Sequence, residues 1–200
     1  MKYSKKFSGN VLIFICYLLS ALIIVTVVIG LCVQNAGMPK LLGNNPEAIA
    51  YLNKNTDPND FTFIVIGDVK GGTATFEAML DIMAPEKPAF AVVLGDFVRH
   101  PQLIEHKLFA LEVAEYINNM PMFLVVGNHD IGKNKDFSIE DFKKTYGAEQ
   151  FSFVIGKNLF ILLTNVADYG KTGKYLEFME QTISKYRDKL ESKFGEQYQI

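Results

Sequence analysis

The feature that most constrains this chain is an uninterrupted apolar run near its N-terminus. Residues 11–33 contain no charged side chain, and 20 of these 23 positions are apolar. At the helical rise of about 1.5 Å per residue, such a helix exceeds the roughly 30 Å hydrocarbon core of a bilayer. A soluble core rarely needs an apolar helix of this length. The run therefore predicts a transmembrane helix in contact with the lipid bilayer.

A cleaved signal peptide is the main alternative, because Lys2, Lys5 and Lys6 precede the run. The apolar core of a signal peptide is, however, usually only about 7 to 15 residues long. Small residues spaced for cleavage are also hard to find after the run. We therefore expect an uncleaved signal anchor. The basic residues are in excess before the apolar run, which places the tail, residues 1–10, in the cytoplasm. The globular part would then lie outside the cytoplasm.

The composition of the whole chain excludes several classes of protein. Its 20 Lys and Arg are balanced by 22 Asp and Glu, so we expect no nucleic-acid-binding module. With 7 Pro against 16 Phe and 9 Tyr, the chain is neither collagen-like nor disordered. Both cysteines, Cys16 and Cys32, lie in the apolar run, which excludes a disulfide framework in the soluble part.

Three apolar runs of strand length follow from residue 61 on, and a glycine ends each of them. They cover residues 61–66, 90–94 and 122–126. Continuous runs of this kind are typical of parallel strands buried on both faces. Apolar residues at helical spacing in 73–84 and 102–118 separate them. The alternation of strand and helix predicts an α/β domain.

The remaining segments of the chain have simpler patterns. Residues 34–60 are polar and turn-rich, which predicts a linker with one short helix near 46–54. Two apolar runs in 151–165 flank Gly156 and predict a hairpin. Charged residues alternate with an apolar face in 174–190, which predicts an amphipathic helix.

An oxygen-bearing side chain follows the terminal glycine of each of the three strands. These side chains are Asp68, Asp96 and Asn128. The carboxyl ends of parallel strands line one crevice, so we expect the three groups to converge. Carboxylate and amide oxygens are ligands of hard cations, whereas a single strand-end Asp is more often a turn or cap residue. Three in succession favour a metal site.

The ordered set of motifs resembles the calcineurin-like metallophosphoesterases. Their signature runs GDxH, GDxxD, and GNH followed by Asp or Glu. The chain has GDVK at 67–70, GDFVR at 95–99 and GNHD at 127–130. The resemblance covers residues 61–195. It implies the first half of a metallophosphoesterase-type α/β sandwich that hydrolyses a phosphomonoester or phosphodiester.

The resemblance also implies roles for the strand-end residues. Asp68 would bind one metal, Asp96 would bridge two, and Asn128 would bind the second, with Mn, Fe or Zn as the divalent or trivalent ions. Two such ions clamp phosphoryl oxygens for in-line attack. His129 would stabilise or protonate the leaving oxygen. Asp130 would orient that imidazole.

Two positions depart from the family pattern. Lys70 stands where the family has a metal-binding His, and an ammonium has no lone pair for a cation. It would repel a metal and meet a substrate phosphate, or it is a solvated turn residue. Arg99 replaces an Asp and is a second, weaker candidate for substrate binding. His106, between Glu105 and Lys107, is interpreted as a surface residue of a helix.

The chain contains no histidine after His129, whereas the family completes its site with two later His-bearing motifs. We therefore expect a domain over 61–200 that is incomplete at its C-terminus and inactive by itself. The leading hypothesis is a membrane-anchored, extracytoplasmic metal-dependent phosphoesterase. The alternative is an inactive, membrane-tethered anion-binding module of the same fold.

Overall fold

A computed structural model describes most of the 200-residue chain. The described residues are 9–70, 73–114, 116–132, 136–166 and 173–194. The chain divides into two compact units, residues 1–37 and 38–200. The first contains a single described helix, α1 (Gly9–Asn35). Its residues Val11–Asn35 are long and apolar enough to cross a membrane, although a signal sequence has the same properties.

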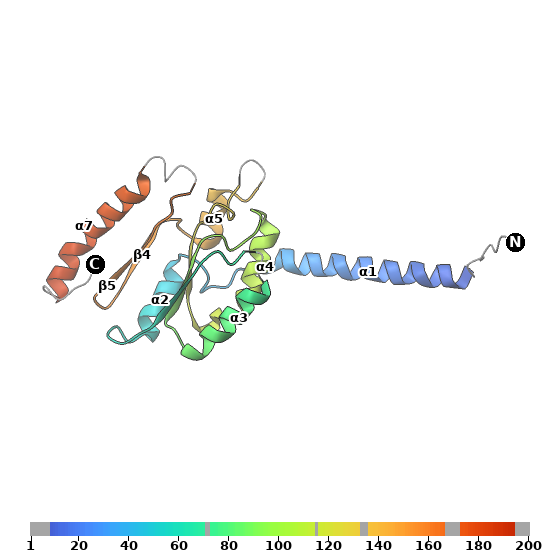
Figure 1. The fold of residues 1–200 in the computed structure, drawn as a ribbon, viewed down its shortest axis with the longest axis horizontal. Coiled ribbons are helices and arrows are strands. Elements are labelled where there is room, and N and C mark those ends of the chain that lie inside the picture. The colour runs from blue at the N-terminus through green and yellow to red at the C-terminus, as the bar shows by residue number, and fades with distance from the viewer. Residues whose placement is uncertain (1–8, 71–72, 115, 133–135, 167–172, 195–200) are drawn as a thin grey trace. The chain divides into compact units, whose positions relative to one another are not determined.

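The second unit is built on a three-stranded parallel sheet, as the alternating pattern predicted (Figure 1). The strands are β1 (Phe63–Ile66), β2 (Phe90–Leu94) and β3 (Met122–Val125). They lie in the order β1-β2-β3, with Phe63 beside Phe90 and Ala91 beside Met122. Because β2 is central, side chains at the ends of β1 and β3 both lie next to it.

Three helices cover one face of this sheet. They are α3 (Thr73–Met83), α4 (Leu103–Ala114) and α5 (Ile139–Tyr146). Alternate strand residues such as Ala91 and Val93 pack with Phe76 and Phe109 in this core. Two short 3-10 helices, η1 (Ala84–Glu86) and η2 (Ile117–Asn119), precede β2 and β3.

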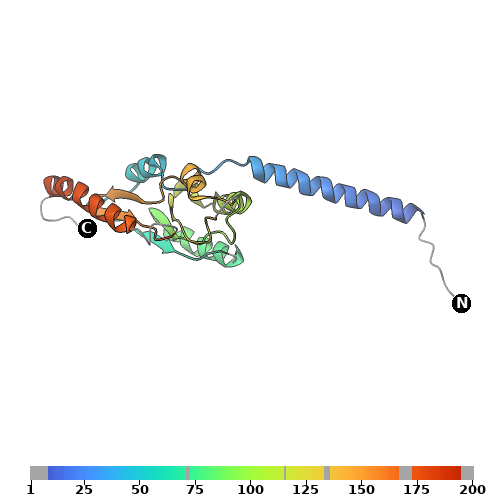
Figure 2. The same cartoon turned by 90° about the horizontal axis from the view of Figure 1, so that it is seen from above.

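The opposite face is covered by one helix and a hairpin. The helix is α2 (Pro46–Asn55), and the hairpin pairs β4 (Phe151–Ile155) with β5 (Asn158–Leu162). Phe90 and Phe123 of the sheet pack against Phe153 of the hairpin. The last helix, α7 (Lys174–Phe194), lies against β5 (Figure 2). The predicted hairpin and amphipathic helix are both present.

The expected linker, residues 34–60, is in large part a component of the domain. Leu42 pairs with Met122 of β3 and is buried. The buried Asn44 amide donates to the carbonyls of Leu124 and Ala148, at 2.6 and 2.8 Å, and its oxygen accepts from the Leu124 amide at 3.0 Å. Hydrogen bonds between the Asn44 side chain and the backbone thus hold this segment in the domain, although its polar composition had suggested a solvent-exposed linker.

Burial on both faces was expected for all three strands and is wrong for β1. Phe63 and Val65 are 44% and 48% exposed, whereas β3 is buried throughout. β1 lies at the edge of the sheet, and its other face carries Ile66 into the core. The hairpin and α2 cover mainly β2 and β3, and they leave one face of β1 partly open.

Candidate active site at the strand ends

The turns after β1 and β2 have the same unusual backbone conformation. Asp68 and Asp96 both have φ of 55°, in the left-handed region that Asp and Asn enter more readily than most residues. The Asp68 amide donates to the Gly95 carbonyl at 3.1 Å, and the Lys70 amide donates to the Asp96 carbonyl at 2.9 Å. Backbone hydrogen bonds therefore join the two turns that carry the predicted aspartates.

Two glycines allow the turns after β2 and β3 to approach closely. A Cβ at Gly127 would collide with the carboxylate and the amide of Asp96. A Cβ at Gly95 would lie 2.8 Å from the Cα of Gly127. Gly95 and Gly127 are thus required by contact between neighbouring strand ends.

The Asp130 carboxylate accepts hydrogen bonds from the backbone of these turns. One of its oxygens accepts from the amides of Asp96 and Gly127, at 2.8 and 2.7 Å. The other accepts from the amides of Phe97 and Val98, at 2.8 and 3.2 Å. Asp130 is fully buried. This corrects the expectation that its carboxylate orients the His129 ring, because both oxygens bind backbone amides.

Burial raises the pKa of Asp130 to about 6, although the hydrogen bonds from the amides of Gly127, Val98, Asp96 and Phe97 act in the opposite direction. The loss of hydration therefore raises the pKa of this carboxyl group more than the four amide hydrogen bonds lower it.

His129 is half-buried beside the same turns. Its amide donates to Asp96 Oδ1 at 3.0 Å, and its Nδ1 lies 3.0 Å from the Arg99 carbonyl. A carbonyl only accepts hydrogen bonds, so Nδ1 carries the hydrogen. In the neutral ring, Nε2 is then the nitrogen with a lone pair. A group of this kind suits proton transfer at a leaving oxygen.

The Lys70 ammonium lies between the two aspartates. Its Nζ is 2.5 Å from Asp68 Oδ1 and 2.6 Å from Asp96 Oδ2. The hydrogen bond to Asp68, followed by that to Asp96, raises the pKa of Lys70 above its ordinary value. Burial acts to raise the pKa of Asp96, yet the hydrogen bonds from Lys70 and the His129 amide outweigh it and lower that pKa. The lysine is therefore charged at neutral pH and paired with both carboxylates.

The fit of the site to metal ions differs between its two halves. A metal shared by Asp68 and Asp96 does not fit while Lys70 donates to both. Asp96 and the exposed Asn128, on neighbouring strand ends, retain oxygen donors of the type that divalent ions accept. Within the described residues, no three His, Cys, Asp or Glu side chains form a metal-binding group.

Arg99 and His100 form a separate cluster with Glu105. Their amides donate to Glu105 Oε2 at 2.9 and 2.8 Å, and His100 Nδ1 lies 2.9 Å from Oε1. Burial acts to raise the pKa of Glu105, but the hydrogen bonds from His100 and Arg99 lower it overall. Arg99 contacts the site residues through its carbonyl, which binds His129.

His106 was expected on the surface of a helix, but it is fully buried. Its Nε2 lies 3.0 Å from the Asp130 carbonyl, and its Nδ1 lies 3.2 Å from the Tyr146 hydroxyl. Its ring stacks on Phe137 with centroids 3.7 Å apart. Burial lowers the pKa of His106 to about 4, so it is neutral at pH 7. His106 supports the backbone of Asp130.

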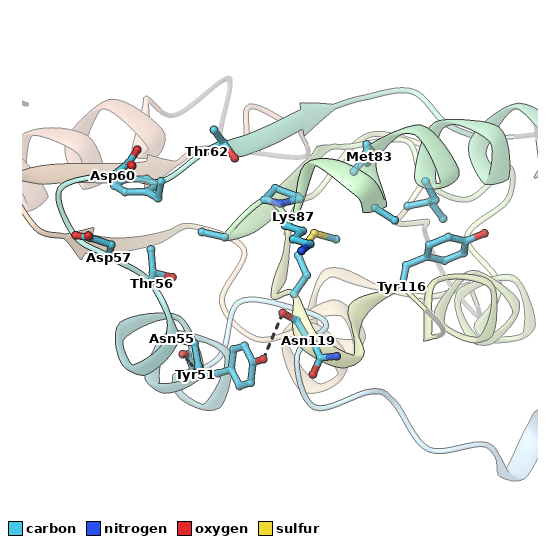
Figure 3. Close-up of a pocket in the computed structure, with 16 residues that line it drawn as sticks. Tyr51, Asn55, Thr56, Asp57, Asp60, Thr62, Met83, Lys87, Tyr116 and Asn119 are labelled. Carbon is cyan, nitrogen blue, oxygen red and sulfur yellow. Dashed lines mark hydrogen bonds between the residues drawn. The ribbon is translucent and has the colours of Figure 1, made fainter.

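A pocket of about 450 Å³ lies at the other end of the sheet (Figure 3). Residues 61–62, 87–89 and 119–120, which precede the three strands, line it. Tyr51 donates to the Asn119 carbonyl at its edge, at 3.3 Å. None of the predicted site residues borders this pocket. The strand-end cluster is a different place in the fold.

Fold and site together define an α/β protein whose polar cluster is built on the carboxyl ends of parallel strands. A family model described as calcineurin-like phosphoesterase matches residues 61–193. Since this is more than half of the chain, the protein belongs to that family, as its motifs indicated. Hydrolysis of phosphate esters is the chemistry that the family name describes.

Curated relatives match a shorter segment. The human protein serine/threonine-protein phosphatase CPPED1 is 34% identical over 85 residues, which cover 40% of this chain and 27% of the relative. Proteins of the same name match from Bos taurus, 34% identical over 85 residues, and Rattus norvegicus, 32% identical over 87, with the same coverage. The chain thus spans about a quarter of these relatives. No solved structure matches it.

Proposed function

We propose that this chain is part of a membrane-anchored, extracytoplasmic phosphoesterase that depends on metal ions. The observation that carries the proposal is the meeting of Asp68, Lys70, Asp96 and His129 at adjoining strand ends. Family membership and the phosphatase relatives support phosphate esters as substrates. The class of ester, phosphomonoester or phosphodiester, stays open.

Each residue of the site would have a separate role in the reaction. Asp96 and Asn128 would hold a metal, and bound metal ions supply positive charge that polarises a phosphoryl group. His129 would give a proton to the leaving oxygen through Nε2, because Nδ1 is held by the Arg99 carbonyl. Lys70 would contact a phosphoryl oxygen as a point charge. Asp130 holds the turns in place without touching substrate.

Binding of inorganic phosphate to the full chain in detergent micelles tests the proposal. We expect Mn²⁺ to raise phosphate affinity by roughly tenfold or more and a chelator to reverse the effect. The Asp96→Asn variant should lose the Mn²⁺ effect, since it removes a charged ligand. The matched control is Asp60→Asn, which changes an exposed aspartate before β1.

The alternative, a metal-independent anion-binding module, predicts another result. Lys70 is already a cation in the site, and this favours phosphate binding without metal. Phosphate affinity that ignores both Mn²⁺ and chelator, yet falls in Lys70→Met, would establish that alternative. Absence of any phosphate binding would contradict both functions.

Membrane anchoring is tested separately. If α1 is an uncleaved anchor with a cytoplasmic N-terminus, protease added to intact cells or spheroplasts should degrade residues 38–200. The same protease should spare them in sealed inside-out vesicles. Recovery of the 38–200 unit in the soluble fraction, without the N-terminal helix, would show that the helix is a cleaved signal.

A further inference from the structure

The Lys70 side chain reaches a position that is unusual for a lysine in a turn. Lys70 lies two residues after Asp68 and one strand away from Asp96, yet its Nζ contacts one oxygen of each, at 2.5 and 2.6 Å. One cationic group thus contacts an oxygen of each carboxylate, as an ion shared by the two would.

The backbone holds the ammonium in this place. The Lys70 amide donates to the Asp96 carbonyl, and the Asp68 amide donates to the Gly95 carbonyl, so hydrogen bonds join the backbones of the turns after β1 and β2. The side chains of Lys70 and Asp96 are 22% and 17% exposed, whereas that of Asp68 is 73% exposed. The Lys70–Asp96 pair is therefore screened less by salt than a pair on the surface.

The charges of the cluster are consistent with one resident cation. Two carboxylates carry two negative charges, and the ammonium neutralises one of them. A divalent ion shared by Asp68 and Asp96 would have to displace the ammonium from both oxygens or lie beside its positive charge.

We propose that the Lys70 ammonium is a built-in cation that replaces one metal ion, so that these strand ends bind at most one divalent ion. That ion would use Asp96 and Asn128. An ammonium has three N–H donors, and the two aspartates use two of them. The third donor is then directed to a phosphoryl oxygen of the substrate. This inference refines the proposed function and rests on it for the substrate.

Metal binding to the untagged full chain in detergent micelles tests the inference, with Mn²⁺ alone as the probe. Calorimetry, with metal analysis after gel filtration, should give no more than one ion per wild-type chain. Lys70→His replaces the ammonium by a ligand and should bind one further ion, or bind Mn²⁺ roughly tenfold more tightly. Lys54→His makes the same change on the exposed side of α2 and should behave as wild type.

A second variant covers the case in which the histidine does not reach the metal. Lys70→Met removes the charge and leaves two carboxylates facing each other. In chelator, we expect Lys70→Met to have a lower melting temperature than wild type. Mn²⁺ should raise the melting temperature of the variant more than that of wild type, so that the difference between the two chains becomes smaller or changes sign.

The outcomes separate this inference from the proposed function. Two ions bound to wild type would overturn the inference and leave the phosphoesterase intact. Equal Mn²⁺ affinity in wild type, Lys70→His and Lys70→Met, with no greater Mn²⁺ stabilisation of Lys70→Met, would overturn it too. Gain of an ion in Lys70→His, together with phosphate binding that ignores metal in wild type, would support the inference and contradict metal dependence.

Discussion

The Asp130 carboxylate accepts a hydrogen bond from the backbone amide of Asp96 at 2.8 Å, so a fully buried acid supports the turn that presents a partly buried one. Asp130 belongs to the turn after β3, and Asp96 belongs to the turn after β2. The contact ties two strand ends together at the point where the site is formed. The acid of the GNHD motif is therefore a positioning residue for the site.

Replacing Asp130 should cost stability as well as site geometry. Asp130→Ala leaves four backbone amides without their acceptor, and we expect a loss on the order of 3 kcal/mol in the free energy of unfolding. Urea unfolding of the full chain in micelles measures it. The control, Asp60→Ala, should change stability by less than about 0.5 kcal/mol. An equally small loss in Asp130→Ala would show that the four hydrogen bonds contribute little.

Acid should weaken the fold through His106. Burial lowers its pKa from 6.5 to about 4, so between these values the unfolded chain binds a proton that the folded chain does not. The contribution of His106 is therefore complete above pH 6.5 and is lost as the pH falls to 4. Asp130 acts in the opposite direction, because its pKa rises from 3.8 to about 6 on folding and its contribution declines as the pH rises through that range.

The two opposite trends make wild-type stability a poor measure of either group, and a variant separates them. We expect His106→Gln to lower the free energy of unfolding by about 3 kcal/mol more at pH 7 than at pH 4, because only the wild type has a group at this position whose pKa changes on folding. Unfolding of both chains at the two pH values provides the comparison. A cost that is the same at pH 4 and pH 7 would mean that His106 keeps its ordinary pKa in the folded chain.

Much of the fold follows from local patterns. The three apolar runs became strands because β-branched and aromatic residues, each run ended by glycine, suit the centre of a parallel sheet. The spacing of His106 with Phe109, Ala110 and Val113 is helical and would have placed His106 on the buried face of α4. Its charged neighbours, Glu105 and Lys107, pointed to solvent instead.

The arrangement of the site is less accessible to sequence reasoning. Motif spacing predicted that Asp68 and Asp96 lie at neighbouring strand ends, but the direction of Lys70 depends on backbone hydrogen bonds between two turns. Asp130 lies next to His129 in the chain, which suggested a side-chain pair. Its carboxylate instead binds amides at positions 96–98, more than 30 residues away.

The buried Asn44 provides a test of whether residues 38–60 belong to the domain. Its side-chain amide donates to the carbonyls of Leu124 and Ala148, and its side-chain oxygen accepts from the Leu124 amide. Asn44→Ala should lower the free energy of unfolding by about 2 to 3 kcal/mol, because buried backbone groups lose their partners. Asn53→Ala, exposed on α2, is the control. Identical stability of the two variants would restore the interpretation of this segment as a loose linker.

Gly127 is the position where a single methyl group tests the packing of the site. A Cβ there collides with the Asp96 carboxylate and amide, so the turns after β2 and β3 must separate. We expect Gly127→Ala to destabilise the fold by roughly 2 kcal/mol, as overpacking does, and to weaken Mn²⁺ binding because Asp96 moves. Gly37→Ala adds the same methyl group where no atom lies within 4 Å and should leave both quantities unchanged. Wild-type stability and wild-type Mn²⁺ affinity in Gly127→Ala would show that the strand ends lie further apart than this arrangement requires.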